Sequence, residues 1–398
     1  MMLGHNANKI RDDFPLLVKN PKLIYFDNAC MSLKPKQVID AQNDYYENYS
    51  GCVARTQHTI GKRVTEETLK AREEIAKFFS AKANDIIFTK NTTESINLIA
   101  RSLEFKQGDV VLGTDKEHNS NLIPWLANKC VKHEYVESNF DNSFSLENFE
   151  KKIKGVKLVS MVHTSNLDGT TIPAKEVIKI AHDHGALVLL DCAQSAAHQE
   201  IDTKKLDVDF MACSGHKMLG PTGIGALYGK PELLEKLNPF MVGGETVTDS
   251  TYDSFKLEKI PQRFEAGLQH YAGMIGFGAA VKYLSALGMD KIHDHEIKLN
   301  TILTQELGYM VDIIGPKDPK ERSGIFSFNV KCMDPHEVAI MLDTAYKIAV
   351  RSGNHCVHSW FNAHNMKGSA RASLYLYNTS DECKVFVDAV KDIVKLKH

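Results

Sequence analysis

The sequence lacks any long apolar run, and it lacks an excess of charge of either sign. Its densest apolar stretch, Ala186–Leu190, lies between His184 and Asp191 and is far shorter than the ~18 to 20 residues that cross a bilayer. The 48 Lys and Arg residues balance 50 Asp and Glu residues, which gives a formal net charge of −2. Without a broad basic surface, neither nucleic acid nor a membrane is an expected partner.

Targeting signals and paired cysteines are also missing. The N-terminal residues contain no apolar core followed by a small-residue cleavage site, and they are not an acid-free, Arg-rich presequence, so we expect a cytoplasmic protein. The 8 cysteines are scattered without a Cys-x-x-Cys pair, which favours neither a zinc ribbon nor a disulfide framework. Most of these thiols should be reduced and buried.

What the sequence does contain is a regular alternation of strands and helices. The five short apolar runs have the length and composition of strands buried in a parallel sheet; they are residues 85–88, 110–113, 158–163, 186–190 and 210–213. An amphipathic pattern over residues 64–80 predicts a surface helix, and residues 171–184 predict another, which ends at Gly185 just before a strand. This rhythm predicts an α/β fold with a large doubly wound, mostly parallel sheet.

A second, smaller α+β domain is expected towards the C-terminus. The pattern is helical over residues 271–307, then changes to a strand over 324–330 and a helix over 336–344. The last helix should begin at a capping box of Thr379 and Glu382. We expect the large domain to span residues 23–284 and the small domain to combine residues 1–22 with 285–398.

Polar residues gather directly after the predicted strands, where ligands bind in such sheets. The candidates are His118, Asn166, Asp191 with Gln194, and Ser214 with His216 and Lys217. Thr92 and Thr93 precede a helix, so their hydroxyls and the free backbone amides could form an anion site. The alternative for these threonines is an ordinary helix N-cap.

One cofactor requires this set of partners together, namely pyridoxal phosphate (PLP). It needs a lysine for a Schiff base, a carboxylate beside the pyridine nitrogen and donors for the phosphate. Lys217 and Asp191 meet the first two needs, and Thr92, Thr93, Ser214 and His216 meet the third. Asn166 and Gln194 could flank the phenolic oxygen, and His118 could cover the ring and carry protons.

The ordered motifs resemble one superfamily over nearly the whole chain. These segments are YFDNACMSLKP, FTKNTTESINLIA, HTSNLDGT, DCAQSAAH, CSGHKMLGPTGIGALYG, RFEAG, RSGNHC and RASLYLYNT. They resemble the class V aminotransferases, PLP-dependent enzymes of fold type I, and look most like the cysteine desulfurases of the SufS and CsdA type. The resemblance implies conversion of L-cysteine to L-alanine, with sulfur taken by Cys356 as a persulfide. It also implies a homodimer and a sulfur-acceptor or scaffold protein of an iron-sulfur assembly system.

The same resemblance gives further residues their roles. Arg371 matches the arginine that binds the substrate carboxylate, and a guanidinium suits a planar anion well. Arg351 should lie beside the substrate, and Arg351, His355 and His358 could place positive charge near Cys356. His355, Cys356 and His358 could instead bind a metal ion, but no second ligand cluster lies nearby in the sequence, so we expect none.

Three departures from the family pattern bear on these expectations. Leu268 replaces a threonine that reaches the phosphate of the other subunit, so Gln269 or His270 must substitute or phosphate binding is weaker. Asn354 removes one titratable neighbour of Cys356, and Ala54 removes a polar side chain near the cleft. The alternatives left open are a selenocysteine lyase or other PLP-dependent C-S lyase, and a non-catalytic sulfur-relay scaffold.

Overall fold

A seven-stranded sheet forms the centre of the larger part of the molecule. The computed structural model describes residues 7–53 and 57–396. In sheet order, the strands are β2 (Ile86–Thr89), β8 (Gly225–Gly229), β7 (Phe210–Ser214), β6 (Leu187–Asp191), β5 (Val156–Val162), β3 (Asp109–Thr114) and β4 (Val131–Val136). Only β8 runs antiparallel to its neighbours. The predicted α/β fold with a mostly parallel sheet is therefore confirmed, and all five predicted strands are present.

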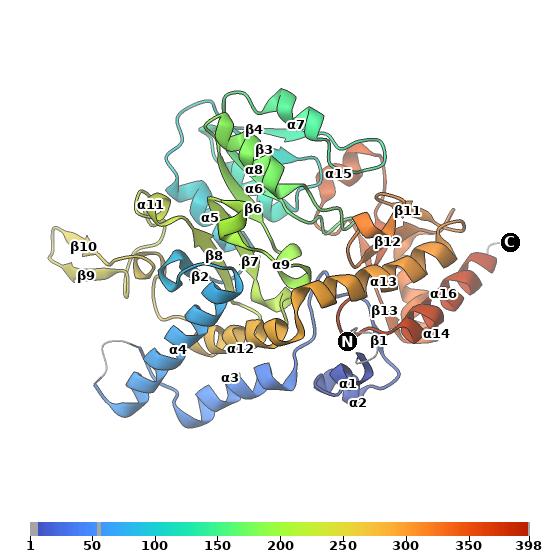
Figure 1. The fold of residues 1–398 in the computed structure, drawn as a ribbon, viewed down its shortest axis with the longest axis horizontal. Helices are drawn as coiled ribbons and strands as arrows, with labels where there is room; N and C mark the ends of the chain where they lie inside the picture. Colours follow the sequence, from blue (N-terminus) through green and yellow to red (C-terminus); the bar gives the residue numbers. More distant parts are fainter. Residues whose placement is uncertain (1–6, 54–56, 397–398) are drawn as a thin grey trace.

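Both faces of this sheet are covered by helices, which explains why its central strands are apolar on both sides. Successive strand residues alternate between two buried clusters: Leu190 packs on the face of α4 (Thr59–Phe78), α8 (Ala174–Asp183) and α12 (Tyr271–Leu287). Leu189 packs on the opposite face, against α5 (Thr92–Ser102) and α6 (Asn119–Ala127). The other helices of this part are α3 (Lys36–Asn48), α7 (Leu146–Lys152), α9 (Ser195–His198), α10 (Thr203–Leu206) and α11 (Pro231–Leu234). Figure 1 shows α3, α4 and α12 together at one edge of the molecule.

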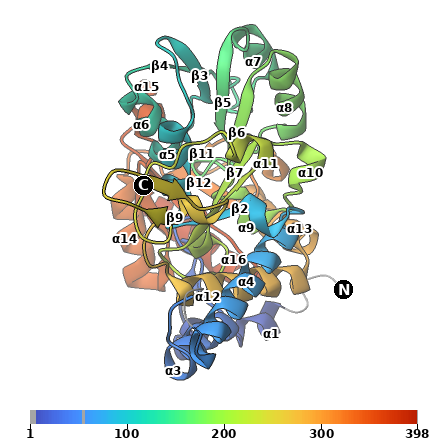
Figure 2. The same ribbon diagram turned by 90° about the vertical axis from the view of Figure 1, so that its left-hand side faces the viewer.

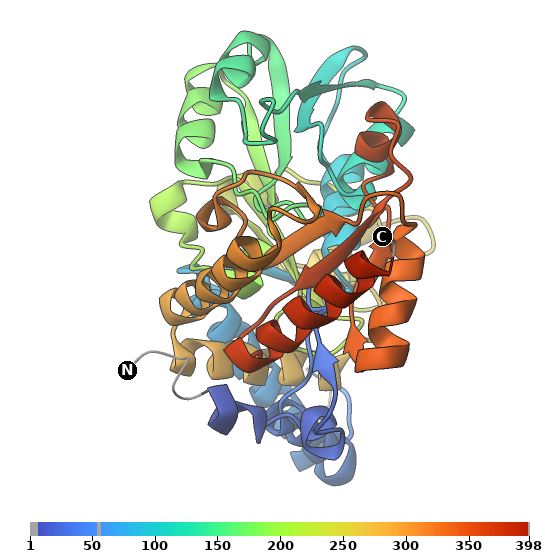
Figure 3. The same ribbon diagram turned by 90° about the vertical axis from the view of Figure 1, so that its right-hand side faces the viewer.

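The smaller part is built on a separate antiparallel sheet. Its strands, in order, are β11 (Asp312–Ile314), β12 (Ile325–Asn329), β15 (Ser369–Ser373) and β14 (Arg351–Gly353). Helices α13 (Met289–Leu307) and α16 (Ser380–Lys395) lie side by side against it (Figure 3), and α14 (Pro335–Tyr346) and α15 (His358–Ala363) complete this part. The predicted capping box is present: the Thr379 hydroxyl accepts from the Glu382 amide, and a Glu382 carboxylate oxygen accepts from the Thr379 amide.

The N-terminal segment connects the two parts. Phe14 precedes α2 (Pro15–Lys19) and packs in the core of the larger part, as does Ile10 in α1 (Ala7–Arg11). Strand β1 (Ile24–Tyr25) instead pairs in parallel with β13 (Ile348–Ala349) of the smaller part. The limits of the two domains given above stay a prediction.

Two further features complete the fold. The helical pattern over residues 271–307 is two helices, because Gly288 between α12 and α13 has a φ of +90°. A hairpin of β9 (Val247–Ser250) and β10 (Phe255–Leu257) projects on the side away from the smaller part (Figures 1 and 2). Over residues 7–53 and 57–396, no single helix meets the length and composition needed to cross a membrane; only α12 and α13 together do, bent by 74°.

Candidate active site

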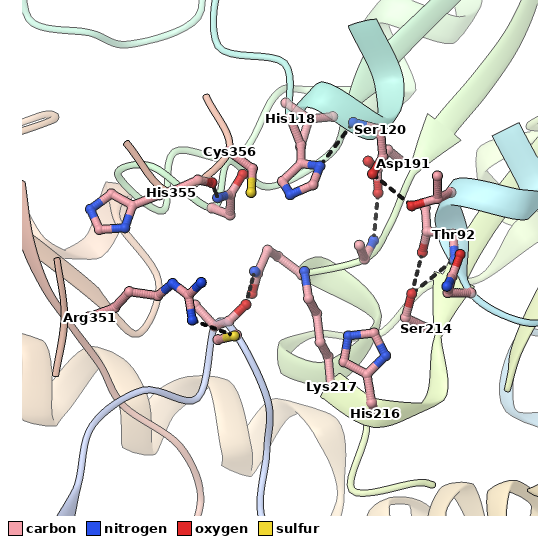
Figure 4. A pocket seen from close by; sticks show the side chains of 18 of the residues that line it. Thr92, His118, Ser120, Asp191, Ser214, His216, Lys217, Arg351, His355 and Cys356 are labelled. Carbon is pink, nitrogen blue, oxygen red and sulfur yellow. Dashed lines mark hydrogen bonds between the residues drawn. The ribbon is translucent and has the colours of Figure 1, made fainter. Parts of the chain in front are cut away.

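One cavity of about 220 Å³ collects the residues that the sequence assigned to the cofactor, the substrate and the nucleophile. It lies at the carboxyl ends of β5, β6 and β7, and β14 and β15 of the smaller sheet close it from the other side. The twelve candidates that line it are Thr92, Thr93, His118, Asn166, Asp191, Gln194, Ser214, His216, Lys217, Arg351, Cys356 and Arg371. The convergence predicted from strand ends is thus present in three dimensions (Figure 4).

Lys217 and Asp191 come from adjacent strands of the large sheet. Asp191 ends β6, and one of its carboxylate oxygens accepts a hydrogen bond of 2.9 Å from the Ala193 amide. Lys217 lies in the 3-10 turn that follows β7. Burial raises the pKa of Asp191 and lowers the pKa of Lys217, while their opposite charges partly offset these shifts. A lysine with a lowered pKa offers a neutral amine, which is the form that reacts with a carbonyl.

Hydroxyls and a helix N-terminus form one end of the cavity. The Ser214 hydroxyl accepts from the Thr92 amide at 2.9 Å and lies 2.7 Å from the Thr92 hydroxyl. Thr93 meets Ser120 at 2.7 Å. The N-cap of α5 is Asn91, whose side chain accepts from the Glu94 amide, so Thr92 and Thr93 are not the cap. Their hydroxyls are paired with Ser214 and Ser120 instead and lie at the positive end of an 11-residue helix, where an anion is favoured.

His216 lies beside the hydroxyls of Thr92, Thr93 and Ser214, which we call the anion corner, and half-buried Lys34 contacts its backbone. The Nζ of Lys34 donates to the His216 carbonyl at 3.0 Å. Burial lowers the pKa of Lys34 to about 7, and burial together with the Lys217 and Lys34 charges lowers the pKa of His216 to about 4. His216 is thus neutral near pH 7 and can meet a phosphate as a hydrogen-bond donor.

His118 is fixed in the cavity as the N-cap of α6. Its Nδ1 accepts from the Ser120 amide at 3.0 Å, which leaves the ring hydrogen on Nε2. Burial, reinforced by the positive charges of Lys217 and Arg371, lowers the pKa of His118 to about 3. The neutral ring can stack on a flat ligand, and its Nε2 hydrogen can be donated in a hydrogen bond.

Two amides, from Asn166 and Gln194, reach the cavity between these groups. The Asn166 Nδ2 donates to the His355 carbonyl at 2.7 Å, and the Gln194 Nε2 donates to the Ala29 carbonyl at 2.7 Å. Their side-chain oxygens are buried and find no hydrogen-bond partner within residues 7–53 and 57–396. Because buried polar atoms are normally paired, these orphaned atoms indicate that a polar ligand belongs here.

Cys356 lies on a short segment that we call the cysteine loop, residues 353–358. The cysteine is exposed, and both His355 and Cys356 have left-handed φ angles, +49° and +59°. The Cys356 carbonyl accepts from the Asn119 amide at 2.8 Å, so the loop is tied to the large sheet through α6. Non-glycine residues in this backbone region are held there by their surroundings, and such positions cluster at functional sites.

The neighbours expected to place positive charge beside Cys356 are engaged elsewhere. His355 is buried, its Nε2 lies 2.9 Å from the Ser369 hydroxyl, and burial lowers its pKa well below the usual value. The His358 Nδ1 lies 3.0 Å from the side-chain Nδ2 of Asn119, and Arg351 contacts Cys30 at 2.9 Å. Across the part of the chain that the structure describes, no cluster of three or more His, Cys, Asp or Glu could hold a metal ion.

Arg371 is buried at the base of the cavity. One of its guanidinium nitrogens donates to the Asn166 carbonyl at 2.7 Å, and another lies 3.6 Å from Asp27. Arg351 is its direct partner across β14 and β15 and also lies 3.6 Å from Asp27. Sequence reasoning missed Asp27 and Cys30 in this region; their place in YFDNAC, next to a two-residue strand, carries no periodic signal.

The structure describes the surroundings of two of the three departures from the family pattern. Leu268 is 73% exposed, and the Gln269 Nε2 donates to the carbonyls of Ala266 and Gly267. Asn354 keeps its side-chain oxygen buried and unpaired among the described residues. Ala54 lies outside the described residues.

The side chains present fit PLP. An amine and a carboxylate lie on adjacent strands, hydroxyl donors surround a helix N-terminus, and unpaired amide oxygens and a neutral imidazole lie between them. These are the partners that the cofactor requires in one crevice.

Comparisons with known proteins agree with this chemistry. The family model described as Aminotransferase class-V matches residues 24–386. A probable cysteine desulfurase of Pyrococcus abyssi is 40% identical over 97% of each chain, and one of Halalkalibacterium halodurans is 42% identical over 95% of each.

Two solved structures of cysteine desulfurases are also similar to this chain. The apo cysteine desulfurase of Thermococcus onnurineus NA1 superposes with a TM-score of 0.94 at 40% identity and covers 97% of this chain and 98% of its own. The cysteine desulfurase CsdA of Escherichia coli, in an S-sulfonic acid form, has a TM-score of 0.91 at 31% identity and covers 98% and 99%. The cofactor predicted from the sequence, PLP, is confirmed at the level of the family. The chain belongs to the class-V aminotransferase family and, within it, to the cysteine desulfurases that its motifs resemble.

Proposed function

We propose that this protein is a PLP-dependent cysteine desulfurase that converts L-cysteine to L-alanine and takes the sulfur onto Cys356 as a persulfide. The observation that supports it is that Lys217, Asp191, Arg371 and Cys356 line one cavity. These four side chains supply an amine, a carboxylate, a guanidinium and a thiol. The reaction needs each of them, and they lie far apart in the sequence.

Arg371 binds the carboxylate of L-cysteine. Its pKa falls to about 10 because of burial, so it remains charged near pH 7, and its Nε has no hydrogen-bond partner among the described residues. A charged, buried and partly unpaired guanidinium is suited to a carboxylate. Its bond to the Asn166 carbonyl fixes the direction in which it points.

The next group of residues holds the cofactor and transfers the α-proton of the substrate. Bound PLP would supply an electron sink for the pair left on the substrate carbon. Lys217 would hold the cofactor, and its neutral amine, which its lowered pKa favours, would take the α-proton of the substrate. Asp191 would pair with the pyridine nitrogen, while Thr92, Thr93, Ser214 and His216 would hold the phosphate. Asn166 and Gln194 would flank the phenolic oxygen, and His118 would cover the ring. The proton that Lys217 has taken would be returned on the way to alanine.

Cys356 is the nucleophile. As a thiolate it attacks the sulfur of the substrate, a new S–S bond forms, and the bond between carbon and sulfur breaks with its electron pair staying on the carbon side. Protonation of that carbon leads to alanine. The exposure of Cys356 supports delivery of the sulfur to another protein, since an acceptor must reach the persulfide.

The setting of the reaction is also part of the proposal. The persulfide passes to a sulfur-acceptor or scaffold protein of an iron-sulfur assembly system in the cytoplasm. The protein acts as a homodimer without nucleic acid or membrane partners, in keeping with a net charge of −2. Sedimentation velocity at micromolar concentration should give a single species of twice the chain mass.

Mass spectrometry after exposure to L-cysteine tests the reaction directly. The purified holoenzyme should gain one sulfur on the peptide that contains Cys356 and release alanine. Cys356→Ala should lose both while keeping the absorbance band of the bound cofactor. Cys130→Ala is the matched control, because Cys130 lines a separate groove and should behave as the unchanged protein.

Two other results would contradict the proposal. Continued alanine release by Cys356→Ala would favour the C-S lyase. A protein that shows no cofactor absorbance, even after PLP is added, would favour the non-catalytic scaffold.

A further inference from the structure

Two thiols, not one, line the active-site cavity. Besides Cys356, the cavity is lined by Cys30, which follows β1 in the motif YFDNAC. Cys30 is partly buried, whereas Cys356 is exposed. None of the roles described above uses Cys30.

The Cys30 sulfur accepts a hydrogen bond from the side chain of Arg351. The Arg351 Nη1 lies 2.9 Å from the Cys30 Sγ and donates a hydrogen bond to it, and Figure 4 shows both the Arg351 guanidinium and the Cys356 side chain in the cavity. Arg351 is paired across the sheet with Arg371, whose buried Nε has no partner within the described ranges. The Arg351 guanidinium therefore contacts the Cys30 sulfur directly, and the neighbouring strand brings Arg371 to the same cavity.

Both thiols lie close enough to Lys217 to affect its pKa. A negative charge on Cys30 and one on Cys356 each raise the pKa of Lys217, an effect that requires proximity. The charge on Cys30 also raises the pKa of Arg371, and that on Asp27 does the same. Cys30 thus shares the cavity with Lys217, Arg351 and Arg371, and Cys356 lines the same cavity.

We propose that Cys30 is a second sulfur acceptor, which takes the outer sulfur from the Cys356 persulfide and holds it inside the cavity. This inference rests on the proposed function, because the Cys356 persulfide must form first. The Cys30 thiolate attacks the outer sulfur, and a bond forms between them. The S–S bond to Cys356 breaks, and its electron pair remains on Cys356 as a thiolate. The transferred sulfur remains a persulfide, so no outside oxidant or reductant is needed.

The chemistry of the site suits this transfer. Arg351 and Arg371 can balance the charge of a persulfide anion at Cys30, and partial burial there shields the sulfur from solvent. Cys356 is regenerated for a second molecule of L-cysteine. One subunit could therefore hold two transferable sulfurs, one inside the cavity and one at its mouth.

Time-resolved peptide mass spectrometry of the holoenzyme tests this transfer. After addition of excess L-cysteine without reductant or acceptor, an extra sulfur should be found first on the Cys356 peptide and later on the Cys30 peptide. The unchanged protein should reach two added sulfurs per chain. Cys30→Ala should stop at one, and its Cys356 persulfide should persist longer. Cys356→Ala should carry none, and Cys130→Ala should match the unchanged protein.

Cys30→Ser separates sulfur transfer from a structural role. A serine hydroxyl can still accept the hydrogen bond from Arg351 but cannot hold a persulfide, so this variant should also stop at one sulfur. Each variant is first checked for its cofactor absorbance and its far-ultraviolet circular dichroism. Extra sulfur confined to Cys356 in the unchanged protein, or a Cys30–Cys356 disulfide in its place, would overturn the transfer while leaving the proposed function intact. Absence of sulfur from both peptides would overturn the proposed function itself, and the transfer with it.

Discussion

Arg371 connects the substrate site to the loop that carries Asn166. Its guanidinium donates to the Asn166 carbonyl at 2.7 Å, and the Asn166 side chain in turn holds the cysteine loop through the His355 carbonyl at 2.7 Å. One buried arginine is therefore in contact with the segment that positions the nucleophile. A lysine at this position would keep the charge but lose the planar fork that meets a carboxylate with two hydrogen bonds.

Arg371→Lys should raise the KM for L-cysteine by roughly tenfold or more and lower kcat by less, because one charge-assisted hydrogen bond is worth about 1.5 to 3 kcal/mol. Steady-state alanine production over a range of L-cysteine concentrations measures both constants. Arg101→Lys on the exposed side of α5 is the control and should leave KM unchanged. An unaltered KM in Arg371→Lys would show that the substrate carboxylate binds elsewhere.

At this scale, the sequence predicts residues that directly follow a buried strand. Asp191 could be found because an apolar run ends immediately before it, and Lys217 because it lies in the turn that follows another such run. Asp27 and Cys30 follow a strand of two residues, too short to form a pattern. The roles of Cys356 and Arg371 were predicted from the family resemblance. Arg371 lies in β15, which reads Ser-Ala-Arg-Ala-Ser and is buried at all five residues.

Strand β8 determines how closely the anion corner approaches the sheet. It runs antiparallel between β2 and β7, and a Cβ added at Gly225 would lie 2.5 Å from the Cys213 carbonyl oxygen and 2.8 Å from the Asn91 Cα. Both contacts are with the backbone, which cannot rotate away. The missing side chain at Gly225 therefore lets the N-terminus of α5 lie close to Ser214.

Gly225→Ala should reduce the free energy of unfolding by about 1 to 3 kcal/mol, as overpacking of a close-packed interior does. It should also weaken PLP binding, because the Thr92 and Ser214 contacts must shift. Urea unfolding of the apoprotein and titration with PLP measure the two effects. Gly244→Ala is the matched control, since no atom lies within 4 Å of its added Cβ. Equal stability of the two variants would contradict the packing argument.

The elements that the sequence predicts are strands buried on both sides and helices with a single apolar stripe. Strands β5, β6 and β7 are buried on both sides, and α16 has a single apolar stripe with a capping box. Strand β4, at a sheet edge, mixes polar, half-buried and exposed residues, and β8 begins and ends with glycine. Neither therefore carries the apolar run that marks a central strand. Pairing of β1 with β13 joins residues more than three hundred positions apart, which local sequence cannot specify.

Across the whole molecule, the site exists because the two ends of the chain come together. The Asn28 Nδ2 donates to the Ser373 carbonyl at 2.6 Å, and the Ala29 amide donates to the Ser373 hydroxyl at 2.9 Å. These bonds hold the segment that bears Cys30 against the strand that bears Arg371. Cysteine, arginine and lysine groups from three distant segments can meet only when both parts of the molecule are folded.

The folded molecule also encloses neutral histidines, and this determines its response to acid. Burial lowers the pKa of His163 to about 4, and the ring lies 3.9 Å from the Cys192 sulfur in the core of the large sheet. In the unfolded chain the same ring takes up a proton near its usual pKa of about 6.5. The unfolded state therefore binds protons first as the pH falls, and stability is lost from about pH 6.5 down to about pH 4.

For His163 alone, this linkage corresponds to a loss of about 2 kcal/mol between pH 7.5 and pH 5. His118 and His216 have similarly lowered pKa values and should steepen the loss. Urea unfolding of the apoprotein at the two pH values measures it. His163→Gln, which has no titratable ring, should be less stable than the unchanged protein at pH 7.5 but lose less on acidification. His184→Gln changes an exposed ring and should keep the full pH dependence. If the free energy of unfolding falls equally with pH in all three proteins, His163 is already protonated in the folded state.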